Sequence, residues 1–346
     1  LVIKRRSKEL ETLGKIDRVA VLGGGSWATA IVKILSEKEI KIDWWLRDAE
    51  SVQCINQKGS NPRYLSHIRV DTTKVKASTD LRACLSEAQV VVLAVPAAFI
   101  LDSLSSFDQL SKDQFWISAV KGMIPNYNLL VTDYLFQHKG IPMEHQVILA
   151  GPCHAEEIAM EKRSYLTIAG VNQDVNHIVA GLFENRFVKT STLTDLYGVE
   201  YCAVMKNIVA IVCGLARGLN YGDNFQAVLV ANAMQEIARF LQSLYPGDRD
   251  LNGSAYLGDL LVTAYSPYSR NRNLGNLIGK GYSLKAAQME MNMIAEGYYA
   301  VKCIHELNGA EEHSAVDMPI TKAVYHVLYD RISPMVELRI LEDWMV

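Results

Sequence analysis

The residue with the clearest chemical potential in this sequence is Lys206. It lies in an apolar stretch in which positions 199, 202, 203, 206, 209, 210 and 213 share one face of a predicted helix. The other residues of this face are Val, Cys and Ala, so an ammonium group there must reach solvent, pair with an acid or take part in chemistry. Burial disfavours the charged form of a lysine, which would suit Lys206 to proton transfer near neutral pH.

A second group of polar residues lies further along the chain. Asp259 could pair with Lys206, and Ser269, Arg270 and Asn271 offer hydroxyl, guanidinium and amide donors that fit a phosphate. A basic surface loop has the same composition. The pattern alone leaves both interpretations open.

A glycine-rich turn follows the apolar run Arg18–Leu22 and precedes a helical stretch. Gly23 permits a tight turn, Gly25 lets the backbone approach a pyrophosphate, and Ala28 is small enough for close packing of the helix on the strand. The N–H groups of the helix start would then face the phosphates. This context predicts a dinucleotide site, although a turn that binds nothing can have the same local sequence.

Three further positions follow predicted strands, where sheets of this kind bind ligands. Arg47 and Asp48 follow the second strand; an acid there selects NAD and an arginine accepts the extra phosphate of NADP, so the coenzyme stays open. Lys121 follows another apolar run and could equally be an ordinary loop lysine. Gly151 opens a Gly-Pro loop that leads into a helix start, where backbone N–H groups could bind an anion and His154 is expected to be structural.

The elements that must position these residues differ between the two halves of the chain. Short apolar runs alternate with helical stretches in the first half, at Arg18–Leu22, Lys41–Leu46, Val90–Val95, Phe115–Val120, Gln146–Ala150 and Tyr165–Ala169. Near-continuous apolar runs indicate strands that are covered on both faces. We therefore expect an α/β N-terminal domain with a Rossmann-like doubly wound sheet.

From Leu196 onward, long helical stretches dominate. They are expected at Val199–Leu219, Phe225–Tyr245, Leu284–Leu307 and Pro319–Leu328, with polar loops at Asn220–Asn224 and Ser266–Gly275. The resulting domain plan is a cofactor-binding domain over residues 16–194, an all-α substrate domain over 195–346 and an N-terminal extension over 1–15.

The composition narrows the class of protein. The 346 residues are 49% apolar and 21% charged, and the net charge of -3 argues against a nucleic-acid or anionic-membrane partner, so an anionic substrate needs local cations. None of the six cysteines shows metal-site or redox spacing, which predicts reduced thiols and no metal. Without a run of about 20 apolar residues or a recognisable signal peptide, the sequence favours a cytoplasmic protein.

Taken together, the motifs resemble the soluble, bacterial-type NAD(P)-dependent sn-glycerol-3-phosphate dehydrogenases. The resemblance spans residues 18–329 and rests on an ordered set of segments: Gly23-Gly-Gly-Ser-Trp27-Ala-Thr29, Asn61-Pro-Arg-Tyr64-Leu, Val120-Lys-Gly122, Gly151-Pro-Cys-His-Ala155-Glu-Glu157, Lys206-Asn207, Gly222-Asp-Asn224, Gly258-Asp259-Leu, Ser269-Arg-Asn-Arg272 and Glu296-Gly297. One segment would be weak evidence, but the ordered set is specific. It implies a helical C-terminal domain like that of 6-phosphogluconate dehydrogenase.

The resemblance also implies a reaction. Dihydroxyacetone phosphate and sn-glycerol 3-phosphate would be interconverted with NAD or NADP, supplying glycerol phosphate for phospholipid synthesis, and the enzyme could be a homodimer. Lys206 resembles the proton donor and acceptor at the C2 oxygen, Lys121 a second lysine near substrate and nicotinamide, and Asp259 the acid beside the catalytic lysine.

The remaining site residues follow from the same resemblance. Substrate contacts are implied for Lys121, Gly151, Cys153, Lys206, Asp259, Ser269, Arg270 and Asn271. Cofactor contacts are implied for Gly23, Gly25, Ser26, Trp27, Arg47, Tyr64, Lys121, Ala155, Arg270 and Glu296.

The sequence departs from the family pattern at three places. Ala28 replaces a commoner Gly, Ser66-His67 replaces Pro-Gly, and Cys153 stands where Ser or Thr is usual. A thiol is a weaker donor than a hydroxyl, so the substrate contact of Cys153 is in question. Two other functions fit the pattern less well: a related two-domain hydroxy-acid dehydrogenase, and a nucleotide-sensing module without catalysis.

Overall fold

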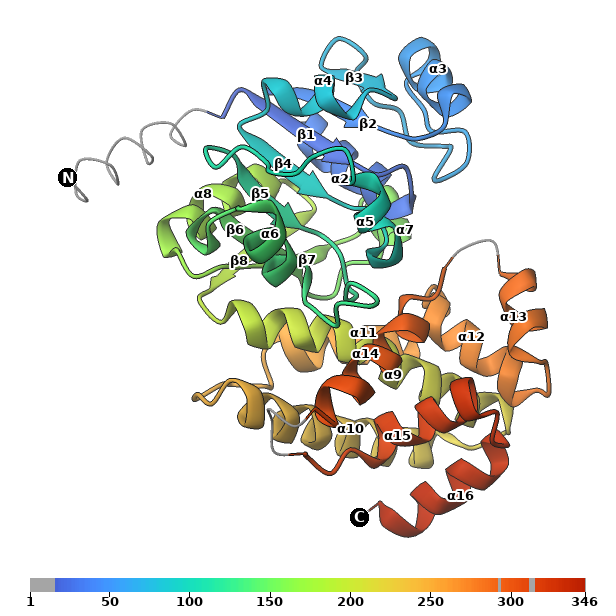
Figure 1. Cartoon of the computed structure of the whole chain (residues 1–346). Coiled ribbons are helices and arrows are strands. Elements are labelled where there is room, and N and C mark those ends of the chain that lie inside the picture. Colours follow the sequence, from blue (N-terminus) through green and yellow to red (C-terminus); the bar gives the residue numbers. More distant parts are fainter. Residues whose placement is uncertain (1–15, 292–293, 311–314, 346) are drawn as a thin grey trace. The chain divides into compact units, whose positions relative to one another are not determined.

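The structure is a computed structural model that describes residues 16–291, 294–310 and 315–345. Its contacts divide the chain into two compact units (Figure 1). The described residues of unit 1 are 16–95, 99–120 and 131–196; those of unit 2 fall within 96–98, 121–130 and 197–345. Two short segments from the first half of the sequence, 96–98 and 121–130, thus belong to unit 2.

Unit 1 is built on one eight-stranded sheet with the order β3-β2-β1-β4-β5-β6-β7-β8. The strands are β1 (Arg18–Leu22), β2 (Lys41–Trp45), β3 (Val75–Ser78), β4 (Val90–Leu93), β5 (Phe115–Ser118), β6 (Gln146–Ala150), β7 (Ser164–Ala169) and β8 (Val188–Leu193). Strands β1 to β6 pair in parallel, and the chain order reverses direction across the sheet at β1 and β4. The predicted Rossmann-like doubly wound sheet is therefore confirmed.

Two strands and one strand direction differ from the sequence expectation. β3 and β8 are the edge strands, and their exposed positions carry Lys, Ser and Thr, so neither gives a continuous apolar run. β7 runs antiparallel to β6. The segment between them holds only the five-residue helix α7 (Ala155–Ala159), which spans about 7.5 Å and cannot return the chain along a strand of about 17 Å.

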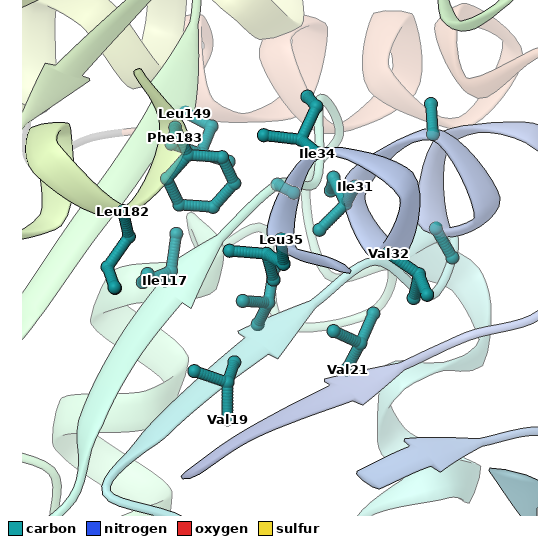
Figure 2. Packing of buried hydrophobic residues seen from close by; sticks show 14 of the residues in the cluster. Val19, Val21, Ile31, Val32, Ile34, Leu35, Ile117, Leu149, Leu182 and Phe183 are labelled. Atoms are coloured by element: carbon teal, nitrogen blue, oxygen red, sulfur yellow. The ribbon is translucent and has the colours of Figure 1, made fainter. Parts of the chain in front are cut away.

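Helices cover both faces of this sheet. On one face, α2 (Ser26–Ser36), α7 and α8 (Gln173–Phe183) share a buried cluster with alternate residues of the strands. Figure 2 shows Ile31 and Leu35 of α2 and Phe183 of α8 pointing toward Val19 of β1 and Ile117 of β5. Helix α4 (Leu81–Ser86) also contacts β1 and β2 but adds nothing to that cluster, because it covers the opposite face. The remaining helices of unit 1 are α3 (Ala49–Lys58), α5 (Ile100–Ser103) and α6 (Val131–Lys139).

Unit 2 is helical, and no strand occurs in the described part of it, which confirms the predicted class of the C-terminal half. Its helices are α9 (Leu196–Gly218), α10 (Asp223–Leu244), α11 (Asp259–Tyr265), α12 (Arg270–Gly279), α13 (Leu284–Glu290), α14 (Glu296–Asn308), α15 (Pro319–Tyr325) and α16 (Pro334–Trp344). Turns of π-helix at Ser254–Gly258 and His326–Asp330 adjoin α11 and α15.

Two expectations for this half are wrong. The polar stretch Ser266–Gly275 was expected to be a loop, but α12 begins within it because the Ser269 hydroxyl accepts a hydrogen bond from the Arg272 N–H, 3.3 Å away. The expected single helix Leu284–Leu307 is divided into α13 and α14. The first turn of α14 is held by a tertiary contact, since the Gly297 N–H donates to Asn271 Oδ1 at 2.9 Å, and such contacts override local propensity.

Helix α9 is the core of unit 2. Among the described residues it is the one helix long and apolar enough to cross a membrane, but its entire apolar window is buried inside the fold. It is thus a core helix, and α12 and α14 pack closely against its backbone.

Helices α9 and α12 approach each other backbone to backbone. A Cβ atom at Gly275 of α12 would lie 2.0 Å from the Ile211 carbonyl oxygen, and one at Gly214 of α9 would lie 2.1 Å from the Arg272 carbonyl oxygen. About one turn further along each helix, Cβ atoms at Gly218 and Gly279 would each lie 2.5 Å from a carbonyl oxygen of the facing helix. Only glycine permits this spacing.

We predict that Gly275→Ala lowers the free energy of unfolding by about 3 kcal/mol, because the added methyl group meets backbone atoms that cannot rotate away. The matched control is Gly181→Ala in α8, where the new Cβ would meet nothing within 4 Å. Helix propensity should make that variant neutral or more stable by up to about 1 kcal/mol. Chemical denaturation measures both, and equal effects of the two substitutions would contradict the close contact.

Candidate functional site

The glycine-rich turn of unit 1 has the geometry of an anion-binding helix start. Gly23 has φ +129°, and a Cβ there would lie 2.5 Å from the Ala94 carbonyl oxygen. Gly25 is the N-cap of α2, has no side-chain cap and leaves open space where a Cβ would stand. The first turn of α2, which begins with Ser26 and Trp27, contains no acid that would compete for its N–H groups. The turn therefore fits a dinucleotide pyrophosphate.

A buried asparagine ties a second segment to this turn. Asn61 is 1% exposed, and its Nδ2 donates to the Gly24 carbonyl oxygen and to Thr29 Oγ1, both at 2.9 Å. Its Oδ1 accepts from the N–H groups of Arg63 at 3.0 Å and Tyr64 at 3.3 Å. Tyr64 is thereby placed beside the turn. The family resemblance includes the segment that begins at Asn61, but local pattern does not predict this role, because an Asn-Pro pair in a loop indicates only a turn.

The two candidate ribose readers after β2 have different partners. Asp48 caps α3: its carboxylate accepts from the Ser51 hydroxyl and from the Ser51 N–H at 3.0 Å, and it pairs with Arg63 at 3.3 Å. The hydroxyl of Ser51 is the main cause that lowers the pKa of Asp48. Arg47 is exposed, and its guanidinium lies 5.0 Å from the ring centroid of Phe99. Asp48 thus has a structural role, whereas Arg47 remains open to a ligand.

The Gly-Pro loop after β6 leads into α7 as expected. Gly151 has φ +99°, and a Cβ there would lie 2.7 Å from the Tyr165 carbonyl oxygen. The thiol of the buried Cys153 donates to the Gly151 carbonyl oxygen at 3.0 Å. His154 is the N-cap residue, and Ala155 begins the helix. The thiol therefore closes its own loop, which is the contact found where the family pattern has a hydroxyl.

Unit 2 contains a buried cluster of three charges. Lys206 on α9 is 4% exposed and Asp259 at the start of α11 is 1% exposed, and the Lys206 ammonium forms an ion pair with Asp259 Oδ1. The Lys121 ammonium lies 3.4 Å from Asp259 Oδ2. Burial alone would raise the pKa of Asp259, but the two lysines hold it below its ordinary value. The partner of Lys206 is thus the acid that the sequence suggested.

The polar start of α12 forms a set of donors in the same unit. Ser269 is the N-cap and is 4% exposed, Arg270 Nη1 donates weakly to the Ile294 carbonyl oxygen at 3.4 Å, and no acid lies in the first turn. Because Asn271 Oδ1 accepts from the Gly297 N–H, the amide nitrogen of Asn271 is left as the donor. A helix start with guanidinium, amide and hydroxyl donors fits a phosphate.

The predicted site residues fall into two sets. Unit 1 holds Gly23, Gly25, Ser26, Trp27, Arg47, Tyr64, Gly151, Cys153 and Ala155. Unit 2 holds Lys121, Lys206, Asp259, Ser269, Arg270, Asn271 and Glu296. Across the described residues, no group of three or more His, Cys, Asp or Glu side chains could hold a metal ion.

Comparisons with known proteins match both halves of the chain to one family. Residues 18–176 match the family model described as NAD-dependent glycerol-3-phosphate dehydrogenase N-terminus, and residues 195–339 match the C-terminus model of the same family. A Syntrophomonas wolfei protein named glycerol-3-phosphate dehydrogenase (NAD(P)+) is 35% identical over 314 residues, 90% of each chain. A Bacillus subtilis protein of the same name is 32% identical over 315 residues, again 90% of each.

A solved structure shows the same arrangement of elements. The glycerol-3-phosphate dehydrogenase of Coxiella burnetii superposes with a TM-score of 0.87 and 27% identity, covering 94% of this chain and 98% of that one. The similarity therefore extends over both units.

The charge cluster predicts a pH dependence of stability. Folding lowers the pKa of Asp259, so the ionised carboxylate stabilises the folded protein. This stabilisation is fully present above the pKa of an aspartate in the unfolded chain, about 3.9. It is lost as the pH falls through the lower pKa that Asp259 has in the folded protein. Asp259→Asn should therefore lower the free energy of unfolding by about 3–5 kcal/mol at neutral pH, since it leaves the buried Lys206 and the half-buried Lys121 without their carboxylate. Urea unfolding at several pH values measures this difference, which should shrink below about pH 4. A difference that stays constant down to that range would contradict the ion pairs.

Proposed function

We propose a reaction for this chain from the premise that it belongs to the NAD-dependent glycerol-3-phosphate dehydrogenase family. It interconverts dihydroxyacetone phosphate and sn-glycerol 3-phosphate by hydride transfer at C2. The observation that carries the proposal is the buried Lys121–Asp259–Lys206 cluster, which lies in the same helical unit as the donors of the α12 start. The product supplies glycerol phosphate for phospholipid synthesis.

Unit 1 supplies the residues that would hold the cofactor. When bound, NADH or NADPH supplies the hydride, and the oxidised form accepts it in the reverse direction. The backbone N–H groups at the α2 start bind the pyrophosphate, and the open guanidinium of Arg47 is available to the adenosine ribose or its phosphate. Asn61 keeps Tyr64 beside this turn, and Ala155 begins the helix that follows the Gly151 loop.

Lys206 transfers the proton in the proposed reaction. It donates a proton to the C2 oxygen when the ketone is reduced and takes it back when the alcohol is oxidised. The Asp259 carboxylate fixes the ammonium in place and balances its charge inside the fold. Lys121, on the other oxygen of the same carboxylate, adds positive charge that stabilises the developing oxyanion at C2.

The start of α12 binds the substrate phosphate. Arg270 and the amide of Asn271 supply charged and neutral donors, with Ser269 beside them, and the positive end of the helix adds to their attraction. Binding energy at the phosphate is then used to hold C2 in a productive position. The family resemblance implies substrate contacts for Gly151 and Cys153 as well, and the Cys153 thiol closes this loop.

The domain plan and setting follow from the same proposal. Residues 16–194 bind the cofactor and residues 195–346 act on the substrate, with Lys121 serving the second task. The partner is a small phosphorylated molecule, the enzyme works in the cytoplasm, and two copies assemble as a homodimer. The names of the relatives favour this activity over the hydroxy-acid dehydrogenase alternative.

Replacing Lys206 by Ala should lower kcat by about 10²- to 10⁴-fold, the range that a positioned proton donor contributes. The affinity for NAD(P)H should change little, because Lys206 belongs to the helical unit and not to the glycine-rich turn. Steady-state assays and fluorescence titration with the reduced cofactor measure the two effects. Turnover close to that of the wild type would refute the role of Lys206.

Replacing Arg270 by Gln should raise the KM for dihydroxyacetone phosphate by roughly ten- to a hundredfold, the effect of losing hydrogen bonds to a charged group. The weak reaction with dihydroxyacetone, which lacks the phosphate, should be little affected. Parallel assays with the two ketones measure the difference. An equal loss on both would assign Arg270 to another task.

A further inference from the structure

The backbone around Lys121 is held by side chains from two helices of unit 2. The Asn207 amide on α9 donates to the Lys121 carbonyl oxygen at 2.7 Å. On the other side, Glu296 at the start of α14 accepts from the Ala97 N–H through Oε1 at 3.2 Å, and the Lys121 N–H also acts on this carboxylate. The Lys121 backbone is therefore held at its carbonyl oxygen by Asn207, and its N–H borders the Glu296 carboxylate.

The contact between Glu296 and this backbone is close. A Cβ at Gly122 would lie 2.7 Å from Glu296 Oε2 and 2.9 Å from the Ala97 Cβ, so glycine is required there for the carboxylate to fit. Burial raises the pKa of Glu296, while the charge of Arg270 and the two backbone N–H groups act against that rise. Glu296 Oε1 thus accepts a backbone N–H, whereas Oε2 is buried against Gly122 with no hydrogen bond among the described residues.

The same turn of α14 also contacts the proposed phosphate donors. The Gly297 N–H donates to Asn271 Oδ1, and a Cβ at Gly297 would lie 2.6 Å from the Asn207 carbonyl oxygen. Residues from α9 and α12 and from the segment 121–130 thus meet at Glu296 and Gly297. Further along α14, Glu306 accepts from Asn128 Nδ2 at 2.9 Å and supports the far end of that segment.

We propose that Glu296 is a positioning residue for Lys121: with Asn207, its carboxylate fixes the Lys121 backbone and so sets where the Lys121 ammonium stands relative to Asp259. The physical reason is that Lys121 has a long flexible side chain whose ion pair with Asp259 spans 3.4 Å, so the position of its ammonium depends on the backbone that carries it. This role differs from the cofactor contact that the family resemblance implies for Glu296, and its catalytic part depends on the proposed function.

Hydrogen exchange tests the structural part without any turnover. In the full-length chain, Glu296→Ala should speed amide exchange at Ala97 and Lys121 by about tenfold or more, because both N–H groups lose their acceptor. Glu306→Gln is the matched control on the same helix, since it touches Asn128 and should leave exchange at Lys121 within about twofold. Unchanged exchange at Lys121 in Glu296→Ala would overturn the proposal.

A double-mutant cycle tests the catalytic part. Glu296→Ala should lower kcat/KM by roughly ten- to a hundredfold in the wild-type background, and by less than about threefold where Lys121 is already replaced by Met. All rates are compared at saturating cofactor, because the family resemblance also implies a cofactor contact for Glu296. Additive effects of the two substitutions under these conditions would overturn the positioning role.

Two further comparisons keep the result decisive. If Glu296→Ala does not fold, Glu296→Gln replaces it, because glutamine keeps the volume and one acceptor oxygen. Glu296→Gln should speed amide exchange at Lys121 and lower kcat/KM, each by about threefold or more. Equal behaviour of Glu296→Gln and the wild type in both experiments would then count against the proposal. Turnover of dihydroxyacetone phosphate by the wild type tests the proposed function separately from the role of Glu296. Absence of this turnover would refute the proposed function, and the exchange experiment would still decide the role of Glu296.

Discussion

One buried carboxylate shared by two ammonium groups is the constraint on which the helical unit depends. Asp259 is almost fully enclosed, so its charge is tolerable only while Lys121 and Lys206 compensate it. Three charges in a protein interior are an expensive arrangement compared with apolar side chains of the same volume. Their presence is explained if the cluster is needed for a charge that develops during a reaction, as in the reduction of a ketone.

The packing of unit 2 holds these charges and the polar start of α12 in fixed positions. Glycines at the contact of α9 and α12 bring the helix that carries Lys206 into backbone contact with the helix that begins at Arg270. The first turn of α14 then joins both helices to the segment that carries Lys121. Because each contact is made by backbone atoms or by buried side chains, small changes in any of them would move charged groups whose energies fall steeply with distance.

Much of this arrangement could be predicted from residue patterns. The parallel strands are apolar on both faces, the turn at Gly23 carries its own geometric signature, and Lys206 stands out on an otherwise apolar helix face. The edge strands β3 and β8 were not predicted, because a strand with one open edge and polar side chains lacks the apolar run that marks the central strands. Residues at the start of α12 read as a loop because helix N-terminal residues and turn residues have the same composition.

Other features depend on contacts between residues far apart in the chain, which local patterns cannot report. The segments 96–98 and 121–130 belong with helices that begin at residue 196 or later, and Glu296 reaches Ala97 across 199 positions. The buried Asn61 likewise has its role only because the turn at Gly24 folds against it. Resemblance to a family could point to Glu296 as important, but its backbone contacts had to come from the structure.

The central claim is that this chain reduces a phosphorylated ketone through a buried ammonium cluster. The most direct measurement is the decrease in reduced-nicotinamide absorbance when the purified protein is mixed with dihydroxyacetone phosphate and either NADH or NADPH, with dihydroxyacetone as the comparison. We expect rapid oxidation of at least one coenzyme with the phosphorylated ketone and little oxidation with the unphosphorylated one. Equal rates with both ketones, or no oxidation with either coenzyme, would contradict it.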